Sequence, residues 1–194
     1  MDEFKSVINS EEKNQGKGIQ IFSMIFAIPA ISLFYSAISE QSLGSLFGAI
    51  GFSLFVALMY GIGFFQKKKY NKLGATPLTL TPSFCTIGSE FSGSIEIPRT
   101  QFNKVKDLSI TSWKYTKITN DSYQFEKVWE STITPTIKYK KNKTMLEFIF
   151  TIPEGSKPSY NGFFSKNKHH WEVSFEFVES MENIKRSWRI PVKI

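Results

Sequence analysis

Two long tracts without a charged side chain most strongly constrain how this chain of 194 residues can fold. They comprise residues 19–38 and residues 43–65, and the short turn Ser39-Glu40-Gln41-Ser42 lies between them. A helix needs roughly 20 apolar residues to cross the hydrocarbon core of a bilayer, and both tracts are that long. We therefore predict a two-helix transmembrane hairpin. A helical hairpin buried in a soluble protein is the alternative, but its helices would show a polar face.

Lysine placement predicts how this hairpin is oriented. The turn between the tracts has no Lys or Arg, whereas lysines flank the hairpin on both sides. By the positive-inside rule, both flanks lie in the cytoplasm. We therefore predict a multi-pass membrane protein with both termini cytoplasmic. The cluster after the second tract is expected to contact anionic headgroups; it consists of Lys67, Lys68, Lys69 and Lys72.

These features divide the chain into four predicted segments. Residues 1–18 form a cytoplasmic tail, 19–65 the hairpin, 66–74 a basic juxtamembrane linker and 75–194 a cytoplasmic domain. The net charge of +7 and the pI of about 9.4 would also suit a nucleic-acid-binding protein. Because the densest lysine cluster adjoins an apolar tract, we expect an anionic lipid surface, and no nucleic acid, as the first partner.

Small residues recur along one part of the second tract at a spacing of about four. Membrane helices approach closely at such positions, because van der Waals packing drives their association. The stripe either packs against the first helix or makes a homo-oligomer or partner contact. Its members are Gly44, Ser45, Gly48, Ala49, Ser53, Ala57 and Gly61.

After Gly74 the apolar period changes to two, which is typical of strands with one buried face. Trp171, Val173, Phe175 and Phe177 alternate with polar residues. Similar alternation occurs in residues 91–97, 146–152 and 188–194, and further strands are expected at 78–81, 108–117, 124–134 and 136–140. About eight short strands with turn signals between them predict an all-β antiparallel sandwich or barrel.

Residues 75–194 also resemble a known bacterial domain. The similar stretches are 88–95, the strand around Trp129, 170–175 and 186–192. They resemble the arrestin-like cytoplasmic sandwich that ends certain uncharacterised multi-span inner-membrane proteins. The resemblance implies an arrestin/immunoglobulin-like fold, a binding role and a location in the bacterial inner (cytoplasmic) membrane, and it implies no catalytic residue. The chain departs from that family in having no sizeable domain between its two spans.

No constellation for catalysis, cofactor binding or metal binding is predicted. The adjacent His169 and His170 should point to opposite faces of a strand, so they cannot share a metal. Cys85 is expected in the core. Glu126 and Glu130 should lie on one strand face about 13 Å apart, which is too far for paired-carboxylate hydrolysis.

Two features of the domain are candidates for binding. Phe163 and Phe164 lie in a predicted loop, and exposed aromatic residues there favour contact with a partner. Two groups of basic residues could add to the membrane-facing charge or could simply keep the surface soluble. They are Lys138, Lys140, Lys141 and Lys143, and then Lys157, Lys166, Lys168 and His169.

The leading hypothesis is a membrane-anchored, non-catalytic adaptor or scaffold whose cytosolic sandwich binds a protein. The alternative is a ligand-gated defence effector that disrupts the membrane in response to a cyclic nucleotide. A toxin immunity protein is a third possibility. The first hypothesis follows from the absence of a catalytic constellation in the sequence, and the second from the layout of two spans before a β-rich domain.

Overall fold

The computed structural model describes residues 6–119, 122–160 and 167–194. The chain divides into two compact units. One unit is helical and comprises residues 12–72. The other is built from strands and combines residues 1–11 with residues 73–194. The predicted loop residues Phe163 and Phe164 lie outside the described residues.

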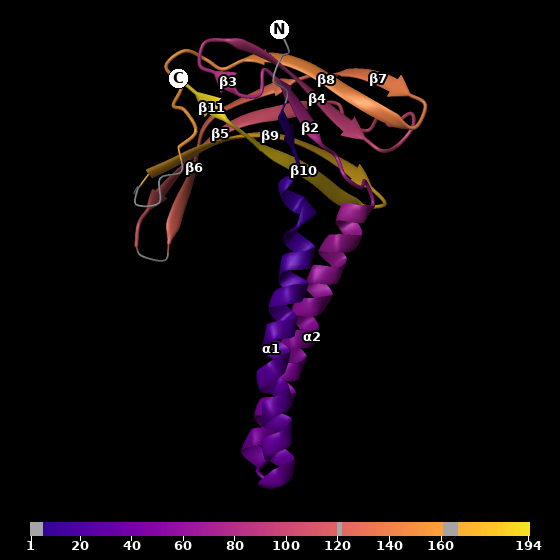
Figure 1. Ribbon diagram of the computed structural model, residues 1–194, viewed down its shortest axis with the longest axis vertical. Coiled ribbons are helices and arrows are strands. Elements are labelled where there is room, and N and C mark those ends of the chain that lie inside the picture. The colour runs from indigo at the N-terminus through magenta and orange to yellow at the C-terminus, as the bar shows by residue number, and fades with distance from the viewer. Residues whose placement is uncertain (1–5, 120–121, 161–166) are drawn as a thin grey trace. The chain divides into compact units, whose positions relative to one another are not determined.

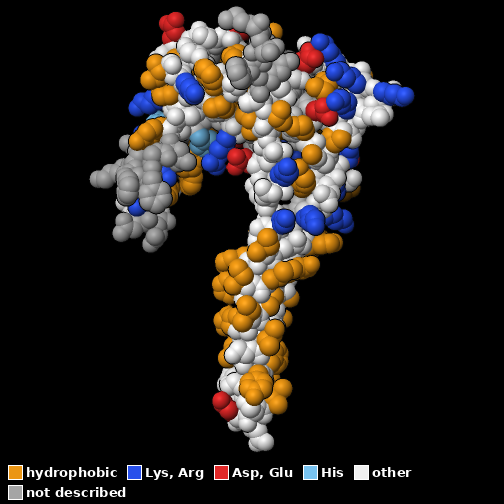
Figure 2. Space-filling model, in the orientation of Figure 1, with side chains coloured by type: hydrophobic (Ala, Val, Ile, Leu, Met, Phe, Trp, Pro, Cys, Tyr) orange, Lys and Arg blue, Asp and Glu red, His pale blue; other side chains and the backbone are white. Residues whose placement is uncertain are grey.

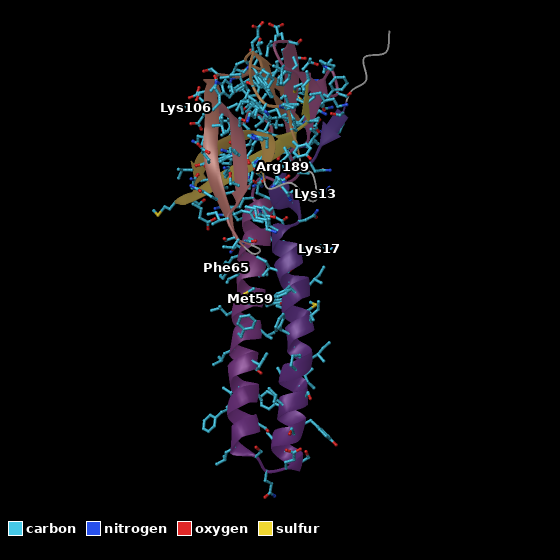
Figure 3. The ribbon with its side chains drawn as sticks, turned by 90° about the vertical axis from the view of Figure 1, so that its left-hand side faces the viewer. Lys13, Lys17, Met59, Phe65, Lys106 and Arg189 are labelled. Atoms are coloured by element: carbon cyan, nitrogen blue, oxygen red, sulfur yellow. The ribbon has the colours of Figure 1, made fainter. Side chains whose placement is uncertain are left out.

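The helical unit consists mainly of α1 (Gln15–Ser39) and α2 (Leu43–Asn71), preceded by the short 3-10 helix η1 (Glu11–Lys13). Both long helices have the length and apolar composition needed to cross a membrane. Hydrophobic side chains cover much of the helix pair (Figure 2). Figure 3 labels Met59 and Phe65 on α2 and Lys17 on α1.

The second helix is longer than its apolar tract. It continues to Asn71, so most of the predicted 66–74 linker is helical. Lys68 and Lys69 lie in its last turn, where the helix dipole favours positive charge. At its other end, the hydroxyl of Ser42 accepts a hydrogen bond from the backbone N–H of Ser45 and caps the helix.

The two helices pack antiparallel through small residues at intervals of seven. Gly16, Ser23 and Ala30 are the buried residues of α1, and Ala49 and Gly63 are those of α2. Repeats of seven keep one seam facing the partner helix, as in left-handed helix pairs.

Gly16 and Gly63 make the closest approach in this seam. A Cβ atom built on Gly16 would lie 2.6 Å from the backbone oxygen of Gly63. Further along, the rings of Phe26 and Phe55 have centroids 5.7 Å apart. Glycine is required at the first contact because the two backbones leave no room for a side chain.

The β unit contains a five-stranded sheet in the order β1-β2-β4-β8-β7, and all of its neighbours are antiparallel (Figure 1). The predicted strand at 78–81 has the bounds that the structure shows. The strands are β1 (Ser6–Ile8), β2 (Leu78–Thr81), β4 (Glu90–Ile97), β8 (Lys143–Thr151) and β7 (Thr136–Lys140).

A four-stranded antiparallel sheet in the order β10-β9-β5-β6 forms the second layer. Its strands are β10 (Glu182–Ile190), β9 (Asn167–Glu179), β5 (Leu108–Lys117) and β6 (Tyr123–Ile133). The short β11 (Val192–Lys193) pairs in parallel with β3 (Cys85–Thr86). The described residues therefore form a mostly antiparallel β domain after two helices.

Alternate side chains of both sheets meet in one core. Leu80 and Ile95 of the first sheet and Trp171 and Trp188 of the second are fully or almost fully buried there. The indole N–H of Trp188 donates to the backbone oxygen of Thr76 at 2.8 Å, which satisfies its polar atom inside the core. Burial of one large apolar side chain contributes roughly 1.5–3 kcal/mol, so this shared layer holds the sheets together.

Strand β1 was not predicted and lies in the segment expected to be a tail. Ser6, Val7 and Ile8 pair with Leu80, Thr79 and Leu78 of β2. The chain between these two paired strands contains the whole helix pair. The helices are thus an insertion between neighbouring strands of one sheet.

The predicted strand at 188–194 is wrong in its second half. Strand β10 ends at Ile190, and β11 leaves for a different partner strand after Pro191. Proline has no N–H to continue the antiparallel ladder. Ile194 was expected to face the core, but it is 93% exposed.

The prediction that Glu126 and Glu130 share a strand face is also wrong. Glu130 pairs with Thr111, whereas Glu126 pairs with Lys114, and a register shift lies between Ser112 and Trp113. Thr111 and Lys114 are three residues apart on β5 and so face opposite sides of the sheet. The bulge therefore separates the two carboxylates onto opposite faces.

Candidate functional site: the aromatic groove

A groove of about 550 Å³ crosses the outer face of the four-stranded sheet near one end of β5, β6 and β9. It combines aromatic rings, two cationic side chains and both histidines. We call it the aromatic groove. Its lining residues are Tyr115, Tyr123, Phe125, Ser159, Tyr160, Lys168, His169, His170, Arg189, Ile190 and Pro191.

Pairing between strands explains why distant residues meet in the groove. Tyr115 of β5 pairs with Phe125 of β6 and with Lys168 of β9. Directly paired residues share a face of the sheet. The next row places His170 of β9 opposite Trp113, on the same face as Tyr115. The groove is therefore assembled by register rather than by a local sequence motif.

Tyr115 is the fixed centre of the groove floor. Its ring centroid lies 4.5 Å from that of Phe125 and 4.5 Å from that of His170. Its hydroxyl lies 3.0 Å from Nε2 of His170, within hydrogen-bond distance. Contacts on both sides of the ring and at its polar end restrict its rotamers, so the floor is organised before anything binds.

The histidines contribute shape and hydrogen bonding without adding positive charge at neutral pH. Burial, helped by the nearby charge of Arg189, lowers the pKa of His170 to about 4. The pKa of His169 is also lowered, by burial and then by the charges of Lys157 and Lys114. Both imidazoles are consequently neutral under physiological conditions.

Lys168 and Arg189 carry the positive charge of the groove. The ammonium group of Lys168 lies 5.7 Å from the ring centroid of Tyr123, in a cation–π contact. Nε of Arg189 lies 3.6 Å from Oε1 of Glu11, and both side chains are partly exposed. Such an exposed pair contributes little and exchanges readily. Figure 3 labels Arg189 on β10.

Backbone hydrogen bonds close one side of the groove. Tyr160 N–H donates to the oxygen of His169 at 2.8 Å, and His169 N–H donates to the oxygen of Tyr160 at 3.0 Å. The hydroxyl of Ser159 accepts a hydrogen bond from the backbone N–H of Val192 at 3.0 Å. These bonds hold Tyr160 beside the sheet although its side chain is 54% exposed.

Exposed aromatic residues lie beside the cations of the groove. Phe125 is 61% exposed and Tyr160 is 54% exposed. Aromatic and apolar groups beside charged ones are typical of the centres of protein interfaces. The arrangement provides ring faces, a neutral imidazole and two cations, a combination suited to noncovalent binding.

The small residues predicted to form one stripe on α2 differ in burial and in their contacts with α1. Ala49 is fully buried, and Gly48 lies against the side chain of Leu33 of α1. Ser45 and Ser53 are half-buried, whereas Gly44 and Ala57 are exposed. Nothing lies within 4 Å of a Cβ built on Gly61.

Helix geometry explains these differences. Steps of four residues advance by about 400°, so such a stripe turns by about 40° per step and leaves the facing helix. Gly63, which was not singled out from the sequence, makes the close contact instead.

The other predicted binding residues lie in different places. Lys67, Lys68 and Lys69 are part of α2, and Lys72 is the residue that caps it. In the basic turn, Lys138 pairs with Glu147 at 2.6 Å and Lys143 pairs with Glu96. These pairs offset part of the positive charge that the sequence places there. Cys85 is fully buried in the core, which confirms the expectation for that residue.

Sequence reasoning singled out only Lys168, His169 and His170 from the groove, and it treated them as parts of a basic loop or a strand entry. Tyr115, Tyr123, Phe125 and Arg189 were missed, because each reads as an ordinary residue of a strand. The one available signal was the presence of large aromatic side chains at solvent-facing positions of strands, where polar side chains are usual.

The comparisons with known proteins give no family for this chain. No family model matches it, and no curated protein matches it. Among solved structures, the sporulation control protein Spo0M from Bacillus subtilis is similar over 61% of this chain and 49% of its own, with 14% identity and a TM-score of 0.41.

The alkylpurine DNA glycosylase AlkC from Pseudomonas fluorescens, solved bound to DNA containing an abasic site analog, is similar over 59% of this chain and 29% of its own. Its sequence identity is 12% and its TM-score is 0.23. The chain thus spans half or less of the length of each neighbour. Likeness at this level assigns neither a function nor a ligand.

Proposed function

We propose that this protein is a membrane-anchored, non-catalytic adaptor whose β domain docks a protein partner in the aromatic groove. The observation that carries the proposal is the composition of the groove, which sets Tyr115, Phe125 and Tyr160 beside Arg189 on an open surface. Tyrosine and arginine are, with tryptophan, the residues enriched at the energetic centres of protein interfaces.

In this proposal, α1 and α2 are the anchor in the bacterial inner membrane, and the β domain lies in the cytoplasm. Pairing of β1 with β2 supports one part of this arrangement, since strands on opposite sides of a bilayer could not pair. The lysines at the end of α2 support the cytoplasmic orientation and contact with anionic headgroups.

The proposed fold of the β domain is an arrestin-like sandwich. Support comes from two antiparallel sheets that contribute side chains to one core. Sandwiches of this kind present sheet faces, edges and end loops for recognition. The groove lies on such a sheet face.

Site-specific photo-crosslinking in intact cells tests the docking proposal. A photo-reactive phenylalanine analogue at position 125 should give a discrete adduct, because Phe125 is exposed beside the groove. The same analogue at position 178, where Val178 is 67% exposed on β9, is the matched control. The proposal fails if position 125 gives no adduct or if both positions give the same one.

A ligand-gated membrane effector is the second candidate function. The groove favours it in one respect, because Lys168 and Arg189 are its charged lining residues and no carboxylate is among the described ones. In that case a cyclic dinucleotide would bind there and trigger assembly of the helices. Depolarisation of cells only when the dinucleotide is present would support this function and contradict the adaptor.

A further inference from the structure

We propose that the aromatic groove recognises an acidic segment of its protein partner, with carboxylates at Lys168 and Arg189 and an adjacent aromatic or aliphatic side chain on the Tyr115 floor. This inference rests on the proposed docking function and names the chemistry of the partner. In this inference, one partner segment makes ionic contacts with the two cations and apolar contacts with the aromatic rings of the groove.

The first argument is the sign of the charge. The charged lining residues of the groove are two cations, and its described lining contains no Asp or Glu. The lining histidines are neutral at physiological pH, so Lys168 and Arg189 carry the charge of the lining itself, while Glu172 and Glu11 act on Tyr115 from outside it. Complementary charge across an interface steers encounter and selects partners, so the groove favours an anion.

The second argument is that Arg189 is held only loosely by its own chain. Its contact with Glu11 is 3.6 Å long and lies at partly exposed side chains. Its cross-strand neighbour Glu172 pairs with Lys185 at 3.4 Å. A partner carboxylate placed bidentately on the guanidinium would make a stronger, charge-assisted contact than the one it displaces.

The third argument concerns the apolar surface beside the cations. Tyr115 is fixed by two ring contacts and by its hydroxyl contact with His170. Phe125 and Tyr160 stay more than half exposed beside it. A bare anion would leave these rings in water, whereas a neighbouring apolar side chain would cover them.

The fourth argument is the spread of the groove over several strands. Phe125 of β6, Lys168 of β9 and Arg189 of β10 line it together. A polypeptide segment presents acidic and apolar side chains in a row and can contact all of these strands at once, which is why the inferred occupant is a peptide.

Peptide selection on the full-length chain tests the inference. The chain is placed in phosphatidylcholine nanodiscs and used to select from a displayed library of random twelve-residue peptides, with empty nanodiscs as the background. The expected winners place Asp or Glu next to an aromatic or aliphatic residue. Enrichment of neutral or basic peptides, or no enrichment above the background, would overturn the inference.

Variants then locate the binding site of the selected peptides. The double variant Lys168→Gln with Arg189→Gln should weaken their binding by on the order of tenfold or more, since charge-assisted contacts are lost. The matched control is Lys140→Gln with Lys141→Gln, which removes the same charge from the exposed end of β7 and the first residue of the turn after it. Equal affinity for the groove variant and the native chain would overturn the inference.

Two further outcomes separate this inference from neighbouring ones. If anionic phosphatidylglycerol in the nanodiscs abolishes peptide binding at physiological salt, the groove is a lipid contact and the inference fails. If the photo-adduct at position 125 forms equally in the double variant, a partner docks there by other chemistry. The docking function would then stand and the acidic-segment inference would not.

Discussion

The hydroxyl oxygen of Tyr115 lies 3.0 Å from Nε2 of His170, and their ring centroids are 4.5 Å apart. This pair connects the central strand β5 to β9 on the outer face of the sheet. Because His170 is partly buried next to Arg189, the pair depends on a neutral imidazole. The floor of the aromatic groove is therefore sensitive to acid.

The first prediction concerns stability against pH. The pKa of His170 is lowered to about 4 in the folded chain from a reference value of 6.5, so the unfolded chain takes up the proton first as the pH falls. Folding stability should fall between pH 6.5 and pH 4. Because the residue is only partly buried, we expect the free energy of unfolding to fall by about 1 kcal/mol, which is less than the full pKa shift would correspond to.

Denaturant unfolding of the full chain in detergent across this pH range measures the effect. The His170→Gln variant is the comparison, because it retains His169, whose pKa is also lowered, and removes only the group in question. The variant should show a shallower fall. Parallel curves of stability against pH for the two proteins would show that His170 does not cause the loss of stability in acid.

The second prediction concerns core packing at Gly93. A Cβ built on this glycine would overlap the ring of Phe148 on the neighbouring strand β8. The Gly93→Ala substitution should lower the free energy of unfolding of the β domain by about 1–3 kcal/mol, as overpacking in a core does. Thermal unfolding followed by near-ultraviolet circular dichroism measures it.

Ser94→Ala is the control on the same strand, since Ser94 faces the other side of β4 and its hydroxyl has no hydrogen-bond partner. It should change stability by less than about 0.5 kcal/mol. If the Gly93→Ala substitution leaves the melting curve unchanged, the ring of Phe148 can move aside and the prediction is wrong.

The third prediction concerns the seam between α1 and α2. A Cβ at Gly63 would lie 2.8 Å from the backbone oxygen of Gly16, whereas a Cβ at Gly61 would meet nothing within 4 Å. Gly63→Leu should therefore separate the helices, and Gly61→Leu should leave them paired. Both substitutions add the same side chain two residues apart in one helix.

Cysteines replacing Phe26 and Phe55, whose rings lie 5.7 Å apart, report on helix pairing. A short bifunctional maleimide should link them within one chain efficiently in the parent and in Gly61→Leu. The intramolecular product should fall several-fold in Gly63→Leu. Equal linking in both variants would argue against close backbone approach, and dimer bands confined to one variant would reveal contact between copies.

The fourth prediction concerns the reactivity of Cys85. Burial raises the pKa of its thiol to about 12, and its side chain is fully buried. At pH 8 the thiolate fraction is about one part in ten thousand, and the sulfur is also shielded from reagents. Maleimide should modify the native chain very slowly and the denatured chain rapidly. Cysteine introduced at the exposed Val178 should react at once in the native state.

The fifth prediction concerns sidedness. A fluorescent reporter active only in the cytoplasm should function after Ile194, and so should one before Met1. A phosphatase that requires the periplasm should be active only when inserted between Glu40 and Gln41, in the connection between α1 and α2. Phosphatase activity at either terminus would reject the proposed orientation and, with it, a cytoplasmic role.

Much of the β domain could be predicted because its strands have one buried and one wet face. The strands expected at 108–117 and 78–81 have the same bounds as β5 and β2. Reasoning from alternation failed where side-chain parity is not kept, as at the bulge opposite Trp113, which no local sequence pattern indicates. The strand formed by residues 6–8 was too short to stand out and is stabilised by pairing with β2.

The candidate site was harder to predict than the fold. Tyr115, His170 and Arg189 come from three strands, and only the register between those strands brings them together. The loop aromatics Phe163 and Phe164 were the more visible signal in the sequence, yet they lie outside the described residues. Gly63 escaped attention because its partner, Gly16, precedes the first apolar tract.

Pairing of β1 with β2 has a consequence for biogenesis. The ribosome releases β1 first, then both helices, and only afterwards the strand that β1 needs. Under the proposed topology, the outer edge of the first sheet can close only after α2 has returned the chain to the starting compartment. A chain that inserts one helix too few would leave β2 with an open edge, a known template for aggregation. Correct membrane insertion would thereby become a condition for completing the sheet, and failed insertion would be exposed to quality control.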